Sequence, residues 1–182
     1  MNAAVVERAS TPVAAKPATP PWLEEVANIW REVLSASTLQ DLPYKIETNR
    51  SGQIVMSPAK NIHGAYQSAI AQLLVTKLGG RTITECAIAT PQGVKVADVA
   101  WAAQAFFDQH SYADPYAVAP EICVEIKSPS NARPELLAKV RLYLDAGARE
   151  VWVVSEEGKV EFFDATGQIE KSSYGVDVPP LK

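Results

Sequence analysis

Two acidic residues and one lysine stand in extended segments that otherwise look apolar. Asp98 interrupts the run GVKVADVAW, and Glu125 and Lys127 alternate with apolar residues in EICVEIK. A carboxylate turned toward a core costs roughly several kcal/mol unless it is paired, hydrogen-bonded or bound to a metal. Carboxylate oxygens, joined by the backbone carbonyl of Ile126, are ligands that Mg2+ or Mn2+ prefers. These residue types predict a metal site that hydrolyses phosphodiesters, with Lys127 orienting water or neutralising the transition state.

The period of two in a strand decides which of these residues share a face. It places Asp98 with Val96 and Ala100, and it places Glu125 with Lys127, about 6.6 Å apart at ~3.3 Å per residue. Each piece also has an ordinary explanation, which is a satisfied structural aspartate in one case and a solvated strand face in the other. The combination on successive strands is what favours a reactive site.

Other familiar catalytic signatures are absent from the sequence. It has no G-x-S-x-G, G-x-x-x-x-G-K-[ST], G-x-G-x-x-G or H-E-x-x-H pattern, and two histidines cannot form a histidine-rich metal site. Two cysteines without C-x-x-C exclude a four-thiolate zinc site within one chain. We therefore expect no organic cofactor and no disulfide framework, and this cysteine usage favours a cytoplasmic setting.

Length and composition predict one ordinary globular unit. The chain has 182 residues, of which 47% are hydrophobic and 21% charged, so it can bury a substantial core. No apolar run approaches the roughly 20 residues of a membrane span, and no secretory leader is recognisable, so we expect no membrane partner. The net charge of -4 argues against coating nucleic acid by bulk charge, but it leaves room for a local basic groove.

The elements that must position the site follow from local patterns. Residues 1–21, rich in Ala and Pro, predict a disordered tail, and residues 22–182 predict the folded domain. Apolar residues at helical spacing predict helices beginning near Leu23, at Asn61 as N-cap, and near Arg133. KIET and GQIVM flank turn residues and predict a hairpin, while residues 102–120 predict an irregular connection.

The remaining strands predict the topology. EICVEIK, a helix and REVWVV should form two parallel strands with a right-handed crossover. RTITECAIA and GVKVADVAW precede them, and KVEFFD and QIEKS should extend the sheet by antiparallel pairing. The order α, β, β, β, α, β predicts a mixed α/β (α+β) fold, in which helices flank a central mixed sheet.

In this order and spacing, several segments resemble a known family. Ala97-Asp98 and Glu125-Ile126-Lys127 are similar to the PD-(D/E)XK nuclease signature, with Ala97 in place of the usual proline. From about Pro43 to the C-terminus, the chain resembles the bacterial Uma2 (DUF820) family of restriction endonucleases. The segments that carry this resemblance are IVMSPAKNIHG, VADVAW, PEICVEIKSPSN, LLAKVRLYLDAGAREVWVV and VEFFD.

The resemblance implies a restriction-endonuclease-like fold and a Mg2+-dependent endonuclease acting on DNA. It implies that Asp98 and Glu125 bind the metal and that Lys127 is the catalytic lysine. Auxiliary residues that match family positions are Glu47 in the hairpin, His63 at the start of the next helix, and Lys139 with Tyr143 on the third helix. Each of these four has an ordinary alternative as an exposed, hydrogen-bonding or packing group, and Glu85 is a reserve ligand.

Two other functions stay open. The chain could be a nucleic-acid-binding or interaction module that kept the fold and lost turnover. Its net negative charge and the replacement of the usual signature proline by Ala97 favour this alternative. It could also be a hydrolase of small phosphorylated metabolites. A homodimer is compatible with restriction-type enzymes, which often pair to cut both strands, but no sequence feature identifies its interface.

Overall fold

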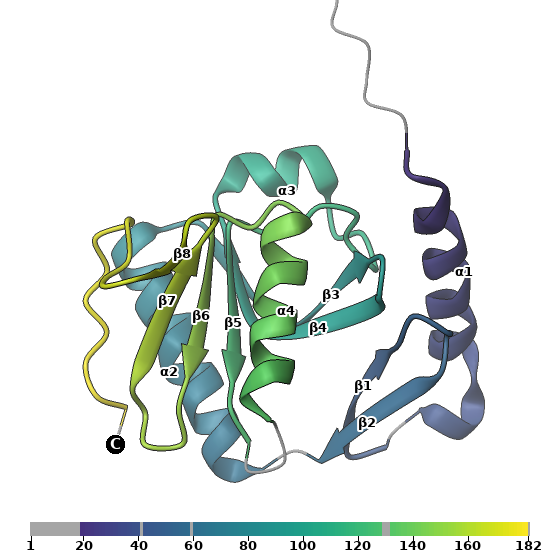
Figure 1. Ribbon diagram of the computed structural model, residues 1–182, viewed down its shortest axis with the longest axis horizontal. Coiled ribbons are helices and arrows are strands. Elements are labelled where there is room, and N and C mark those ends of the chain that lie inside the picture. The colour runs from purple at the N-terminus through teal and green to yellow at the C-terminus, as the bar shows by residue number, and fades with distance from the viewer. Residues whose placement is uncertain (1–18, 41, 59, 129–131, 182) are drawn as a thin grey trace, which may run out of the picture.

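The computed structural model describes residues 19–40, 42–58, 60–128 and 132–181. A six-stranded sheet carries helices on both faces, and a separate two-stranded hairpin lies at one side (Figure 1). In chain order the elements are α1 (Pro21–Ser35), the 3-10 helix η1 (Ser37–Leu39), β1 (Tyr44–Thr48), β2 (Ile54–Pro58), α2 (Asn61–Leu78), β3 (Arg81–Thr90), β4 (Gly93–Ala102), α3 (Gln104–His110), β5 (Ile122–Ile126), α4 (Arg133–Asp145), β6 (Glu150–Val154), β7 (Val160–Asp164) and β8 (Gly167–Ile169).

The central sheet has the strand order β3-β4-β5-β6-β7-β8. Neighbouring strands are antiparallel except β5 and β6, which are parallel and connected through α4. The predicted core order is confirmed as α2, β3, β4, β5, α4 and β6, and β7 and β8 extend the sheet as expected. The fold is therefore the mixed α/β architecture that the sequence predicts.

Helices α2 and α4 cover opposite faces of the sheet. Successive residues of β5 point to opposite sides, and they pack against different helices. Ile122, Val124 and Ile126 pack in the cluster with residues of α2, and Cys123 packs in the cluster with residues of α4. In Figure 1, α4 lies on the viewer's side of the sheet next to β5, and α2 lies behind the sheet. Since both faces are covered, every residue of β5 is buried, which explains its nearly apolar sequence.

The hairpin of β1 and β2 is confirmed and packs beside the first half of β4. Ile46 of β1 packs against the cluster that joins Val94 and Val96 of β4 to Trp30 of α1. Gly93, at the start of β4, has a φ of +91°, and a Cβ there would lie 2.5 Å from main-chain carbonyl oxygens at the end of β1. The missing side chain allows β4 to begin directly against the hairpin, which sets the hairpin's distance from the sheet.

The ladder between β3 and β4 is interrupted at a single position. Their register places Glu85 opposite Asp98, and this is the one pair absent from the ladder between Arg81–Thr90 and β4. Glu85 has a φ of +53°, in the left-handed region that side chains rarely adopt. Val96 packs with α1, whereas Ala100 packs in the cluster with α4. Asp98 and Ala100 lie opposite Glu125 and Cys123, so these two residues share a face of the sheet as expected. Val96, before the interruption, packs against different neighbours.

Three further predictions differ in detail. The connection expected to be irregular contains α3, whose seven residues are too few for a helical period to be recognised in the sequence. Helix α2 begins at Asn61 itself, and Lys60 occupies the N-cap position. The predicted tail covers residues 1–21, of which residues 1–18 lie outside the described part of the chain. Helix α1 begins at Pro21, the last residue of the predicted tail.

Two smaller findings concern the cysteines and the helices. Cys86 and Cys123 are both free and buried, and burial raises the pKa of the Cys86 thiol to about 12. In the part of the chain that the structure describes, no helix has both the length and the apolar character needed to cross a bilayer.

Candidate active site

Asp98 and Glu125 lie opposite each other on neighbouring strands. The pairing of Val99 with Val124 places the adjoining residues of β4 and β5, Asp98 and Glu125, in register. Both residues are buried, with exposed fractions of 1% and 3%. Asp98 Oδ2 also accepts a hydrogen bond of 2.6 Å from the backbone N–H of Ile126. The structure thus brings together the two carboxylates that the sequence singled out.

The hairpin contributes an ammonium group to these carboxylates. Lys45 of β1 places its Nζ 2.5 Å from Asp98 Oδ1 and 3.8 Å from Glu125 Oε2. Glu47 lies two residues further on the same side of β1 and is also buried. Its Oε1 accepts a hydrogen bond from the backbone N–H of Val96. The predicted auxiliary residue Glu47 is therefore part of the cluster, accompanied by a lysine that the sequence did not single out.

Helix α4 closes the cluster from the other side. Lys139 Nζ lies 2.6 Å from Glu47 Oε1 and 3.3 Å from Glu125 Oε2. One helical turn later, the Tyr143 hydroxyl donates a hydrogen bond of 2.6 Å to Glu125 Oε1. Tyr143 is fully buried, so this bond is shielded from water. The expected shared face of Lys139 and Tyr143 is what brings both to Glu125.

His63 and Glu85 approach Asp98 from the side of α2 and β3. His63 Nε2 lies 3.1 Å from Asp98 Oδ1. Gln67, one turn after His63 on α2, donates to Glu85 Oε1 at 2.5 Å and to the Asp98 carbonyl oxygen at 3.2 Å. The possible ligand atoms of His63, Glu85 and Asp98 lie within 4.8 Å of one another. Both the auxiliary histidine and the reserve carboxylate therefore stand beside Asp98.

Lys127 is placed differently from the other predicted residues. β5 ends at Ile126, and Lys127 Nζ lies 3.9 Å from Glu156 Oε1, which belongs to the turn after β6. The Lys127 side chain is 41% exposed. The positions beside the two central carboxylates are occupied by Lys45 and Lys139. The alternation that would turn Lys127 toward the carboxylates ends with the strand, so the structure does not bring it to them.

The surroundings shift the pKa values of the two central carboxyl groups in opposite directions. Burial acts to raise the pKa of Asp98, but the Lys45 charge and the His63 hydrogen bond outweigh it and lower the pKa to about 2. Burial also raises the pKa of Glu125, and here Lys139 and Lys45 offset only part of the effect. Divergent pKa values in neighbouring carboxyl groups are typical of sites where one group stays ionised and the other exchanges a proton.

The donor set fits a divalent cation. Four carboxylates, those of Glu47, Glu85, Asp98 and Glu125, face the ammonium groups of two lysines, which formally leaves an excess of two negative charges. Asp98 stands between Glu125 on one side and the pair of His63 and Glu85 on the other. Carboxylate oxygens suit Mg2+ and Mn2+, and an imidazole nitrogen is compatible with transition metals. Ile126, whose carbonyl is the third predicted ligand, lines the same cavity.

A cavity of about 110 Å³ opens onto this cluster. Its walls come from the hairpin, α2, the β3–β4 pair, the end of β5 and α4, so five separate parts of the chain meet there. A neighbouring cavity of about 160 Å³ shares part of its lining. The residues lining both cavities are Pro58, Lys60, His63, Ile126 and Ser128.

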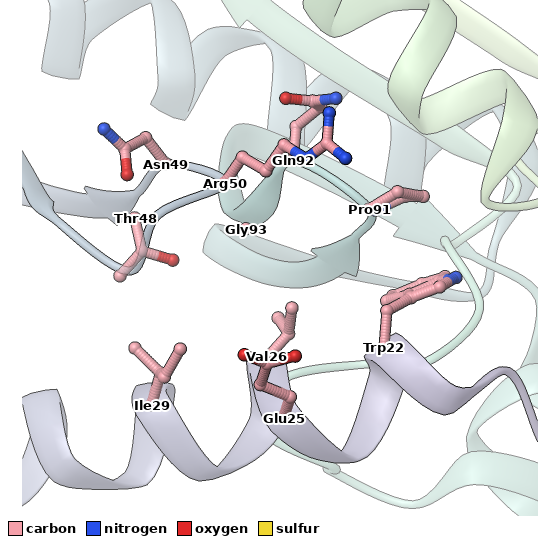
Figure 2. Close-up of a pocket in the computed structure, with 10 residues that line it drawn as sticks. All are labelled: Trp22, Glu25, Val26, Ile29, Thr48, Asn49, Arg50, Pro91, Gln92 and Gly93. Carbon is pink, nitrogen blue, oxygen red and sulfur yellow. The ribbon is translucent and has the colours of Figure 1, made fainter.

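A different cavity, of about 360 Å³, lies between α1 and the turns of the two hairpins (Figure 2). Val26 and Ile29 of α1 face Thr48, at the end of β1, and Gly93, at the start of β4, across it. Its lining offers one carboxylate and one guanidinium group, from Glu25 and Arg50. Size alone therefore does not identify the reactive site, because paired carboxylates line the smaller cavity.

Sequence reasoning missed Lys45 and Gln67 as members of the site. A signal for Lys45 was present, since Lys45 and Glu47 alternate in KIET and must share a face of their strand. Nothing local indicates which face turns toward Asp98, because the contact spans 53 residues of sequence. For Gln67, its position one turn after His63 on the same helix was the available signal.

Comparisons with known proteins concern the family and the fold of the chain. The model of a family named Uma2, described as "Putative restriction endonuclease", matches residues 32–181. Among solved structures, the chain is similar to a crystal structure of "a putative nuclease belonging to DUF820" from Anabaena variabilis, with 17% sequence identity and a TM-score of 0.57. That match covers 75% of this chain and 87% of the other, and at this identity it concerns the fold. No curated protein matches the chain.

Proposed function

The chain belongs to the Uma2 family, and we propose that it is a divalent-cation-dependent endonuclease that hydrolyses phosphodiester bonds of DNA. The family description and the nuclease-like fold support the reaction class. The observation that carries the proposal is the pairing of Asp98 with Glu125 on adjacent strands, with Lys45 and Lys139 within 4 Å of these carboxylates. Such a cluster combines oxygen ligands for a cation with positive charge for a phosphoryl group.

The proposed ligands of Mg2+ or Mn2+ are Asp98, Glu125 and the backbone carbonyl of Ile126. When bound, the cation supplies a water of lowered pKa and positive charge for the phosphoryl oxygens. Tyr143 donates to Glu125 Oε1, and the Ile126 N–H donates to Asp98 Oδ2. Each carboxylate is thereby held in one orientation, as supporting hydrogen bonds orient metal ligands. The other oxygen of Asp98 lies beside Lys45 and His63, and that of Glu125 beside Lys139, so a bound cation would displace or share these contacts.

We propose Lys45 and Lys139 as the ammonium groups that act beside the scissile phosphate. Lys45 contacts both central carboxylates, and Lys139 is held by Glu47 and Glu125. Positive charge fixed where negative charge develops lowers the barrier to phosphoryl transfer. The sequence-based hypothesis gives this role to Lys127, and it stays an alternative that mutation of each lysine decides.

His63 has an auxiliary role in the proposal. Its hydrogen bond to Asp98 raises the pKa of the imidazole, although burial opposes the rise. A protonated His63 adds positive charge at the mouth of the cavity, where a DNA phosphate would enter.

Plasmid cleavage tests the proposal. Supercoiled DNA incubated with the protein and Mg2+ or Mn2+ should be nicked or linearised, and EDTA should stop the reaction. Glu125→Gln keeps the side-chain size but removes the ionised ligand, and it should lose cleavage. Glu32→Gln, on the exposed face of α1, is the matched control. Full cleavage by Glu125→Gln would contradict the proposal.

A binding module without turnover is the second candidate, and one contact favours it. Lys45 already neutralises Asp98 directly at 2.5 Å, so the cluster is paired without a cation. A protein of this kind would bind DNA but show no cation-dependent cleavage. A hydrolase of small phosphorylated metabolites would instead release phosphate from nucleotides and leave plasmid DNA intact.

We also propose a homodimer, because two sites held together can cut both strands of a duplex in one encounter. Sedimentation velocity of the purified chain, with and without DNA, measures this directly. Double-strand breaks made by a protein that sediments as a monomer under both conditions would remove the dimer from the proposal.

A further inference from the structure

The cavity of about 160 Å³ beside the carboxylate cluster has a chemistry of its own. Its lining adjoins the site at His63, whose Nε2 lies 3.1 Å from Asp98. Away from His63 the walls become mainly apolar, from Pro58, Ile62 and Tyr66.

The apolar walls are well fixed. Tyr66 and Ile126 are 2% and 3% exposed, and the Tyr66 hydroxyl donates a hydrogen bond of 3.2 Å to the carbonyl oxygen of Glu156. Ile62, by contrast, is 48% exposed although it is large and apolar. An apolar slot with buried, fixed walls and an exposed aliphatic rim at Ile62 suits a flat ring system, which gains by leaving water.

Charged groups stand at the edge of the same slot. Lys60, Lys127 and Glu156 line it, the Lys127 side chain is 41% exposed, and its Nζ lies 3.9 Å from Glu156 Oε1, which leaves one net positive charge at this edge. An ammonium group beside an apolar slot matches a ligand that joins a ring to a phosphate, which is the composition of a nucleotide. This gives Lys127 a place in the site even though its ammonium is turned away from the carboxylates.

The size of the slot limits how the nucleotide can enter. Its volume lies well below the roughly 300 to 1,000 Å³ of drug-sized pockets, so it admits one ring system and no base pair. Bases inside a duplex are paired and stacked, and an enzyme reaches one only in a single strand or after extrusion. From these observations we propose that the cleaved strand enters unpaired, with one base in this slot and the adjoining phosphodiester at Asp98 and Glu125. The inference rests on the proposed nuclease function and names its substrate class as single-stranded or locally unpaired DNA.

Binding without cleavage tests the inference on the intact protein. In EDTA, fluorescence anisotropy compares three labelled probes of equal length: a single strand, its duplex, and a strand whose nucleotides are all abasic. The single strand should bind at least about tenfold more tightly than the duplex, since only its bases can enter the slot.

Two variants on one helix localise the effect. Ile62→Ala removes an exposed wall of the slot and should weaken single-strand binding by about fivefold. Val75→Ala removes a similarly exposed apolar side chain, 40% exposed and about 20 Å further along α2, and should change nothing. On the abasic strand, Ile62→Ala and the wild type should bind equally, because no base is present to lose the contact.

The outcomes separate the inference from the proposed function. Equal or tighter binding of the duplex, or equal weakening by Ile62→Ala on normal and abasic strands, overturns the inference. If the slot inference is overturned but the protein still cleaves plasmid in a cation-dependent way, the proposed nuclease function stands and only the single-strand preference falls. If single-strand binding depends on Ile62 but no cleavage occurs, the slot assignment holds and the catalytic proposal falls.

Discussion

Two regions of the molecule bury carboxylates, and they do so in different ways. Glu150 of β6 is 1% exposed and accepts hydrogen bonds from Trp152 Nε1 at 2.8 Å, from Ser172 Oγ at 2.8 Å and from the Ser173 backbone N–H at 2.6 Å, with a further bond from the Ser173 hydroxyl. All of these donors are neutral. They tie the C-terminal segment to the middle of the sheet.

The cluster around Asp98 and Glu125 is held by charge. Its partners are the ammonium groups of Lys45 and Lys139, and its carboxylates outnumber them. The cluster also lines a cavity, whereas the Glu150 carboxylate is covered by the segment that it holds. Burial of an acid is thus no mark of function by itself. What distinguishes a candidate active site is an excess of buried charge that faces an opening.

The largest expected effect separates the two regions by activity. Asp98→Asn should reduce the cleavage rate by more than about a hundredfold, because losing a metal ligand costs more than losing a residue that only supports one. Glu150→Gln, measured in parallel per folded molecule, should leave the rate within about twofold. Equal losses of cleavage rate in Asp98→Asn and Glu150→Gln would show that the two buried carboxylates do not differ in function.

The lysines offer the next test. Lys45→Met should reduce the rate at saturating DNA by about a hundredfold, the loss typical of removing one group that stabilises transition-state charge. Lys127→Met should leave that rate nearly unchanged and weaken DNA binding instead, since its ammonium lies toward Glu156. The reverse pattern in single-turnover kinetics would restore Lys127 as the catalytic lysine.

The free energy of unfolding should depend strongly on Glu150, the buried carboxylate of the second region. Glu150→Ala leaves the buried Trp152 and Ser173 N–H donors without an acceptor and should lower the free energy of unfolding by about 3 kcal/mol. For a chain of this size, that corresponds to a fall in melting temperature of about 6 to 12 °C. An unchanged melting temperature in calorimetry would show that Glu150 is not a structural anchor.

The smallest expected effect is a dependence on acid. The pKa of Asp98 is lowered from 3.8 to about 2, so its contribution to stability is complete above about pH 4 and is lost as the pH falls toward 2. In EDTA, the difference in unfolding free energy between wild type and Asp98→Asn should therefore shrink by about 2 kcal/mol between pH 5 and pH 2. Urea titrations at several pH values measure this. A difference that grows as the pH falls would contradict the ion pair with Lys45.

The sequence predicted the elements whose patterns are local. The unit of β5, α4 and β6 was predictable because β5 alternates between two covered faces and α4 presents Leu136, Val140 and Tyr143 to the sheet. The helical period also placed Lys139 and Tyr143 on one face of α4, and both reach Glu125. These contacts follow from periods of two and 3.6 residues, which short stretches of sequence contain.

The remaining features depend on contacts between distant segments. Lys45 reaches Asp98 only because the hairpin docks on β4, and no strand pattern specifies that docking. The left-handed conformation of Glu85 and the missing pair opposite Asp98 interrupt the β3–β4 ladder, and no pattern in the sequence indicates that interruption. Lys127 was assigned by extending an alternation past the end of its strand.

Calorimetry of Mn2+ binding tests the central claim most directly, because it needs neither substrate nor turnover. Wild type and Glu150→Gln should each bind Mn2+ at a site that Asp98→Asn and Glu125→Gln both abolish. Retained binding in the Asp98→Asn and Glu125→Gln variants, or no binding in the wild type, would contradict the account of this cluster as the cation site of a nuclease.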